Sequence, residues 1–301
     1  MAVEQTVIEG LLVVFYVYIL LVIITSKEKI LKNAFYSIFI ATGIADVTAL
    51  ISGCTLRLTN EASSKEGVEG IMRCCCILSG ISACAHLIGN LFITINRYSA
   101  LCLPYKYDSI WTRRNLLAAV VVQYTVSFAA FAHLFTAEFV YIYNEDGTIA
   151  YIILEESAST TVTVTYCISY ATYAILCFGF NSRAFFAWRR LSKTDGWSKH
   201  RHHDKGLLLY AAAVFIGSML MCIQEVAYGI AVATGVVALM QLLLIPFFWL
   251  IDLMVSIPPI FLLLLSSDLR QKVIDPFRRT KNIVTATVSH SRSRAVTVVK
   301  F

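Results

Sequence analysis

Seven long apolar segments constrain the fold of this 301-residue chain more than any other feature of its sequence. A helix needs roughly 20 mostly apolar residues to cross the hydrocarbon core of a bilayer. With 58% hydrophobic and only 15% charged residues, the chain is also too apolar for a soluble domain. We therefore predict an all-α membrane protein, a seven-transmembrane helix bundle. The predicted spans are residues 7–25, 33–53, 72–98, 116–136, 162–181, 207–233 and 241–265.

The distribution of lysine and arginine predicts the orientation of the bundle, because cytoplasmic loops retain an excess of these residues. The amino end and the loops after spans two, four and six contain Arg57, Lys65 and Arg73, and the alternate segments contain the other 22 of the 25 basic residues. Together with the acids, this makes the first set −7 and the second +16. We predict that the amino end lies outside and the tail inside. The net charge of +6 therefore does not indicate nucleic-acid binding.

Besides Glu9 at the outer end of span one, three acids fall inside the predicted spans, where ionisable side chains are costly and commonly functional. Asp46 and Asp252 lie near the middle of spans two and seven, and they are candidates for a shared water, sodium ion or proton. Protonation of the carboxyl groups alone is the alternative. The third acid, Glu225, lies in the outer half of span six. No phosphate-binding loop, nucleophile elbow or metal-binding pair accompanies them, so we expect neither an enzyme nor a cofactor nor a metal.

Polar and aromatic side chains in the outer halves of spans three, five and six form a candidate ligand site. On span three they recur every three or four residues, which places them on one helix face. The alternatives are helix-to-helix contact for the polar residues and simple packing for the aromatic ones. The candidate ligand-binding residues are Ser79, Ser82, His86, Tyr166, Ser169, Tyr170, Gln224, Glu225 and Tyr228.

Cysteines flank the predicted first outer loop, an oxidising location if the orientation is right. Cys54 could pair with Cys74, or with Cys75 or Cys76. Reduced thiols packed among the helices are an equal alternative.

Three stretches of sequence resemble known receptors. Asn96-Arg97-Tyr98, followed by Pro104, is similar to the acid-Arg-aromatic triplet of rhodopsin-like G-protein-coupled receptors, and Asp46 in "GIADVTAL" resembles their Ala-Asp element. "NRYSALCLPYKYDSIW" and "IDLMVSIPPIFLLLLSSDLR" more closely resemble nematode serpentine chemoreceptors of the gamma and V classes. Spans four, five and six lack the Trp, Pro and Cys-Trp-x-Pro of the rhodopsin-like pattern, so we do not carry over its detailed switch.

The resemblance implies a chemosensory receptor of the plasma membrane, in a sensory cilium, that detects an extracellular small molecule such as an odorant or pheromone. It also implies a heterotrimeric G protein as partner. Arg97 would contact that protein, although it could instead snorkel to the membrane interface as an anchor; Asn96 offers it only a hydrogen bond. A ligand-gated channel or transporter is the alternative function, but no internal repeat is evident. The expected coupling residues are Asn96, Arg97, Tyr98, Pro104, Trp111, Arg189 and Arg190.

The segment after span seven is expected to form a short amphipathic cytoplasmic helix along membrane lipid. Leu269, Val273 and Ile274 would face the lipid, and Pro276 would end the helix. We predict a receptor domain over residues 1–280 and a disordered tail over residues 281–301. The identity of the ligand, the class of G protein and dimerisation stay open.

Overall fold

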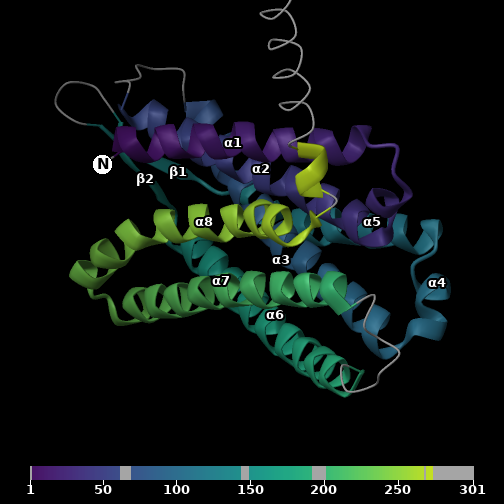
Figure 1. The fold of residues 1–301 in the computed structure, drawn as a ribbon. Coiled ribbons are helices and arrows are strands. Elements are labelled where there is room, and N and C mark those ends of the chain that lie inside the picture. The colour runs from purple at the N-terminus through teal and green to yellow at the C-terminus, as the bar shows by residue number, and fades with distance from the viewer. Residues whose placement is uncertain (1, 62–68, 144–148, 192–200, 268, 274–301) are drawn as a thin grey trace, which may run out of the picture.

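The chain folds into a bundle of long helices with a β-hairpin at one end (Figure 1). The computed structural model describes residues 2–61, 69–143, 149–191, 201–267 and 269–273. The long helices are α1 (Ala2–Thr25), α2 (Ala34–Glu61), α3 (Glu69–Cys102), α5 (Arg113–Phe131), α6 (Glu156–Leu191), α7 (Arg201–Thr234) and α8 (Val237–Leu265). Shorter elements are the 3-10 helices Lys29–Lys32, Pro104–Lys106 and Ala132–Phe135, the helix α4 (Tyr107–Ile110), and the strands β1 (Phe139–Tyr143) and β2 (Ile149–Leu154).

Each predicted span coincides with one of the seven long helices. Six of these helices are long and apolar enough to cross a membrane, and the described apolar part of α8, Trp249–Leu265, is shorter. The fourth predicted span agrees with the apolar segment Arg113–Phe135, in which α5 ends at Phe131 and the 3-10 helix Ala132–Phe135 continues it. The all-α prediction also missed β1 and β2, which pair antiparallel. Their alternating aromatic and β-branched residues are typical of a hairpin.

The central helix is α3, which packs against α2, α5, α6 and α7, while α1 packs against α2 and α8. Gly89 of α3 shows why the helices approach so closely at one level. A Cβ atom there would collide with Thr42 of α2 and with the Gln123 side chain of α5. The Gln123 amide donates instead to the Ala85 carbonyl oxygen at 2.9 Å. Small residues at such crossings are typical of membrane bundles.

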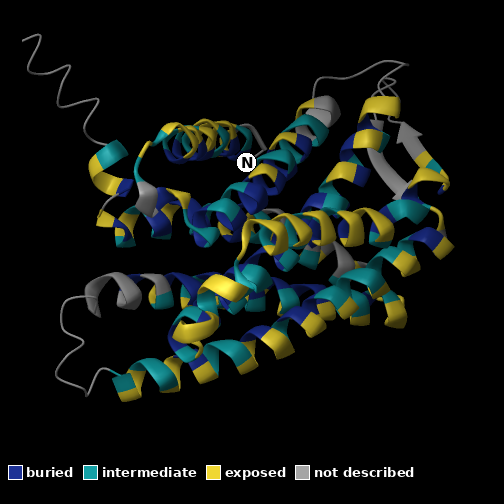
Figure 2. Cartoon of the chain, turned by 90° about the vertical axis from the view of Figure 1, so that its right-hand side faces the viewer, coloured by how far each residue is buried: buried dark blue, intermediate teal, exposed yellow. Residues whose placement is uncertain are grey.

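Buried and exposed residues alternate around the long helices (Figure 2). Many of the exposed residues are large and apolar, and several of the buried ones are polar. Large residues such as Val14, Ile175 and Ile216 are more than half exposed, whereas Asn90 and Gln123 are almost completely buried. This distribution is the one that lipid requires, because a bilayer solvates apolar surface and leaves polar groups to find partners inside the protein.

The two ends of the bundle differ. We call the end that carries β1 and β2 the hairpin end, and the opposite end the Arg97 end. At the hairpin end, the Arg73 guanidinium donates to the carbonyl oxygens of Phe135 at 2.6 Å and Ala137 at 3.1 Å, and lies 5.3 Å from the centre of the Phe139 ring. Arg73 thus ties the start of α3 to the segment that leads into β1.

The segment after α8 continues as a short helical stretch whose apolar side chains face the protein. Leu269 is fully buried in the core, and Val273 packs against the same core. Lys272 pairs with Glu28, 2.8 Å apart, in the connection between α1 and α2. The prediction that Leu269 and Val273 face lipid is therefore wrong, because the bundle itself offers them an apolar surface. Ile274, Pro276 and the predicted tail, residues 281–301, lie outside the described residues.

Candidate functional site

A cavity lies between α2, α3, α6, α7 and α8, in the half of the bundle toward the hairpin end. We call it the inner cavity; its empty volume is about 420 Å³. Asp46 and His86 lie on one side, and Glu225 on another. The lining residues are Asp46, Ala49, Ser79, Ser82, Ala83, His86, Tyr166, Tyr170, Met221, Glu225, Phe247, Ile251, Met254 and Val255.

A second, more open cavity adjoins the first between α6, α7, α8 and strand β2. This outer cavity has about 600 Å³ of empty space, including the part open to solvent. Tyr166, Glu225 and Phe247 line both cavities, so the two form one recess that deepens from the hairpin end. The other lining residues of the outer cavity are Leu154, Ser159, Val162, Thr163 and Tyr228.

Most of the predicted ligand-binding residues meet in this recess. Ser79, Ser82, His86, Tyr166, Tyr170 and Glu225 line the inner cavity, and Tyr228 lines the outer one. Two do not. Ser169 lines a separate apolar groove between α3, α5 and α6, since it lies three residues from Tyr166 but on a different face of α6. The Gln224 amide donates to the Leu243 carbonyl oxygen at 2.6 Å, which ties α7 to α8.

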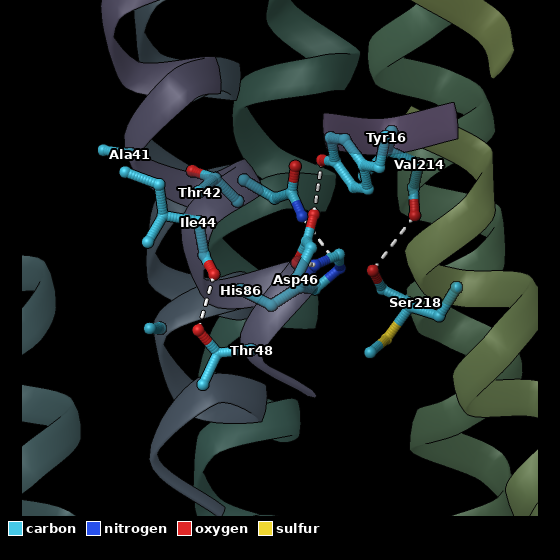
Figure 3. A network of polar contacts seen from close by, with 12 residues as sticks. Tyr16, Ala41, Thr42, Ile44, Asp46, Thr48, His86, Val214 and Ser218 are labelled. Carbon is cyan, nitrogen blue, oxygen red and sulfur yellow. Dashed lines mark hydrogen bonds and ion pairs between the residues drawn. The ribbon is translucent and has the colours of Figure 1, made fainter. Parts of the chain in front are cut away.

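The floor of the inner cavity is a buried polar network (Figure 3). The Tyr16 hydroxyl of α1 donates to Asp46 Oδ2 at 2.6 Å, and His86 Nδ1 lies 2.6 Å from Asp46 Oδ1. On the other side of the imidazole, the Asn90 amide nitrogen is 2.8 Å from His86 Nε2. An amide nitrogen can only donate, so Nε2 accepts and Nδ1 donates to the carboxylate. The polar stripe on α3 therefore has both expected roles. Ser79, Ser82 and His86 line the cavity, and His86 also connects α3 to Asp46 of α2.

Of the two acids predicted to share a site, Asp46 is among the described lining residues of the inner cavity and Asp252 is not. Its Oδ2 accepts a hydrogen bond from Gln5 of α1 at 2.7 Å, about three helical turns from Tyr16 on the same helix. Ile251 and Val255 of α8 line the inner cavity, whereas Asp252, one residue on, is turned about 100° away from Ile251. The two acids thus have separate partners among the described residues.

Arg97 at the other end of α3 faces into the bundle. It is 8% exposed, and its guanidinium carbon lies 4.3 Å from the centre of the Phe35 ring of α2. Its Nη2 donates to Asn96 Oδ1 at 2.9 Å. The Phe35 ring in turn meets Tyr210 of α7 edge to face at 5.6 Å. In this structure Arg97 is therefore nearly buried, with its guanidinium group against an aromatic ring inside the bundle.

The other expected coupling residues divide into buried and exposed ones. Asn96 is fully buried, and its amide donates to the Tyr107 hydroxyl at 3.1 Å. The Trp111 indole donates to Ser99 Oγ at 2.7 Å, so both residues hold the segment between α3 and α5 in place. Tyr98 packs on Phe180, with ring centres 5.2 Å apart. The exposed residues of the set are Pro104, Arg189 and Arg190.

The nine cysteines of the chain are free thiols in the structure, so the predicted bridge from Cys54 to Cys74 does not form there. Cys74 is exposed while Cys75 is buried, since adjacent residues on a helix point about 100° apart. The alternative of packed, reduced thiols describes Cys75. Among the residues that the structure describes, no group of three metal-ligating side chains occurs.

Several residues of the site were not anticipated from the sequence. Tyr16 and Phe247 lie in apolar runs, where an aromatic residue carries no signal of a polar or ligand contact. Phe35 likewise stands in the apolar sequence "AFYSIFIATG". Leu154 could have been found from the strand pattern of "IAYIILEE", because it ends β2 at the outer cavity.

An apolar-surfaced bundle of long helices with polar groups buried inside is typical of multi-pass membrane proteins. The family described as "Serpentine type 7TM GPCR chemoreceptor Srv" matches residues 5–279. The chain belongs to this family, which confirms the resemblance to serpentine chemoreceptors. No curated protein matches the sequence.

Proposed function

We propose that this protein is a chemosensory G-protein-coupled receptor of the plasma membrane that binds an extracellular small molecule in the inner and outer cavities. The observation that carries the proposal is the recess itself. It brings seven of the nine predicted ligand-binding residues together from three helices. In this proposal the hairpin end faces outside, in agreement with the charge distribution of the sequence, and a sensory cilium is the expected location.

The Arg97 end would then face the cytoplasm and a heterotrimeric G protein. Exposed residues of suitable chemistry are available there. Tyr105, beside Pro104 in the segment after α3, is 101% exposed, and the exposed Arg189 and Arg190 end α6. Exposed aromatic and arginine side chains are both enriched at docking surfaces.

Two contacts between α2 and α3, which we call clamps, support a mechanism in which α7 moves against these two helices. Asp46 and His86 join α2 to α3, and Phe35 and Arg97 join the same helices eleven residues away on each, about 16 Å along the axis. Glu225 and Tyr210 both belong to α7. A ligand at Glu225 could therefore shift Tyr210 against Phe35, provided that it binds one arrangement more tightly than the other.

The test is ligand-evoked nucleotide exchange on a panel of Gα subunits, using membranes that contain the full chain and are challenged with nematode-secreted extract and small odorants. Ala83→Met would place a larger side chain in the inner cavity and should weaken the potency of the active compound about tenfold or more. Ala118→Met, on the exposed side of α5, is the matched control and should respond like wild type.

Silence from folded, surface-exposed protein across the whole panel would contradict the proposal. A ligand-evoked current in the same cells would favour the alternative function, a ligand-gated channel or transporter.

A further inference from the structure

The recess contains one buried acid, Glu225, whose side chain has no hydrogen-bond or ion-pair partner among the described residues. Glu225 is 4% exposed and lines both cavities. Among the described residues, no hydrogen bond or ion pair reaches its carboxyl group. Asp46, in contrast, accepts from Tyr16 and His86. Glu225 is thus aimed into a cavity without a donor to satisfy it.

A largely buried carboxyl group without a protein donor is costly, since it has lost most of its hydration and accepts no hydrogen bond from the protein in exchange. A ligand that brings its own donors would recover this cost. A cation recovers more than a neutral donor, because its attraction to a carboxylate is strong where water is excluded. The described residues that line the two cavities include no lysine or arginine, and His86 is engaged with Asp46.

Several aromatic side chains line the same cavities as the Glu225 carboxyl group. Tyr166 and Phe247 share both cavities with it, Tyr170 lines the inner cavity, and Tyr228 lines the outer one. The faces of such rings attract ammonium groups within about 6 Å of the ring centre. A carboxylate beside several rings therefore forms a site for an organic cation.

The approach to the recess is acidic as well. Glu69 at the start of α3, Glu138 before β1 and Glu155 after β2 are all exposed at the hairpin end. Arg73 at the same end is already engaged with two backbone carbonyl oxygens and the Phe139 ring. A field of this sign attracts cations toward the outer cavity.

We propose that the recess takes small organic amines in their protonated form, with the ammonium group on the Glu225 carboxylate and the apolar part among the rings of Tyr166, Phe247 and Tyr228. This inference rests on the proposed function, because it uses the same recess as the ligand site. It specifies the chemistry of the ligand, which the shape of the recess alone does not.

The experiment compares ligands of nearly equal shape and different charge on the purified full chain in detergent, without any G protein. Thermal unfolding is measured during titration with 2-phenylethylamine and with 2-phenylethanol, and the pair hexylamine and hexanol is tested in the same way. The amines should raise the melting temperature of wild type, and the alcohols should do so at least about tenfold less potently.

Glu225→Gln keeps the shape of the side chain and removes its charge, so it should weaken amine binding at least about thirtyfold. Asp108→Asn, an exposed acid at the Arg97 end, should change it by no more than about twofold. Equal potency of amines and alcohols on wild type would overturn the inference, as would wild-type amine binding by a folded Glu225→Gln protein. Absence of any shift with both amines would also overturn it.

The comparison of amine with alcohol uses wild type and so does not depend on the folding of a variant. Binding is measured apart from nucleotide exchange. Amine binding without exchange would therefore contradict the proposed coupling alone, and exchange evoked only by neutral compounds would contradict the amine inference alone.

Discussion

At the scale of single residues, the bundle is organised by how each buried polar group is satisfied. Asp46 has a donor on each carboxylate oxygen, from Tyr16 of α1 and from His86 of α3. These contacts join three helices that no backbone hydrogen bond connects. Glu225 has an equally buried position without such donors, which separates a residue that holds the fold together from one that is available to a ligand.

Asp46→Ala should therefore destabilise the protein markedly. It leaves the Tyr16 hydroxyl and the His86 imidazole as buried donors without an acceptor, at a cost of about 1–3 kcal/mol in total, because hydrogen bonds inside membrane bundles are worth less than their burial suggests. The measurement is thermal unfolding in detergent, followed by a thiol-reactive dye on the buried Cys84 and Cys177.

The matched control is Thr48→Ala, two residues along α2. The Thr48 hydroxyl donates only to the Ile44 carbonyl oxygen of its own helix and is exposed (Figure 3), so its loss should change stability by less than about 0.5 kcal/mol. An equal loss of stability in the two variants would show that the Asp46 network does not stabilise the bundle.

At the scale of elements, the β-hairpin is held to the bundle by an arginine. The segment between residues 137 and 161 contains no cysteine, so a disulfide cannot connect the hairpin to the start of α3. Arg73 connects the start of α3 to the segment before β1 with two hydrogen bonds and a ring contact. Because Leu154 of β2 lines the outer cavity, Arg73 also positions one wall of the candidate ligand site.

Arg73→Ala should loosen the hairpin while the helices stay folded. The lost contacts are partly exposed and worth about 1 kcal/mol, so hydrogen exchange at the amides of β1 should become about fivefold faster. Exchange is measured by mass spectrometry on peptides that cover β1. Arg114→Ala, an exposed arginine at the Arg97 end, should leave this exchange unchanged, and the same rate in wild type and Arg73→Ala would exclude the anchoring role.

At the scale of the whole molecule, the two ends of the bundle are connected through α2, α3 and α7. The Asp46 network and the Phe35–Arg97 contact join α2 to α3 at two levels. At the Arg97 end, the Tyr210 ring of α7 packs edge to face against Phe35. Asn96 stands where the rhodopsin-like triplet has an acid, so an acid–arginine salt bridge is missing here. Such a salt bridge, when exposed, contributes little to stability. A desolvated cation–π contact can contribute about 2 kcal/mol, so an aromatic clamp is a physically adequate replacement.

Phe35→Leu should raise nucleotide exchange in the absence of ligand. Leucine preserves apolar volume but removes the ring under Arg97 and beside Tyr210, which weakens the clamped arrangement by about 1–2 kcal/mol and enlarges the minor population about fivefold or more. Basal exchange is measured on the Gα subunit that responds to ligand.

Phe178→Leu provides the comparison for this variant, because Phe178 of α6 is 65% exposed on the outer surface. Its basal exchange should equal that of wild type. A Phe35→Leu protein that is folded and shows unchanged or lower basal exchange would exclude the clamp as a restraint on activation.

Much of the candidate site could be predicted from sequence because polar residues are rare in membrane helices and their spacing shows which face they share. Ser79, Ser82 and His86 were found in this way. Ser169 and Gln224 were assigned to the site by proximity along the chain, but the rotation of their helices turns them to a groove and to α8. Rotation about a helix axis depends on the neighbouring helices, which one sequence segment does not contain.

The sequence by itself determined the seven spans and the class of protein, since an apolar run of sufficient length is stable in lipid only as a helix whose backbone bonds are internal. The tertiary structure decided which polar groups satisfy one another. Asp46 and Asp252 look alike in sequence, yet one pairs with His86 and Tyr16 and the other with Gln5. Such pairings join residues far apart along the chain, and they depend on how the helices pack because each buried donor must find the acceptor that its neighbours bring within reach.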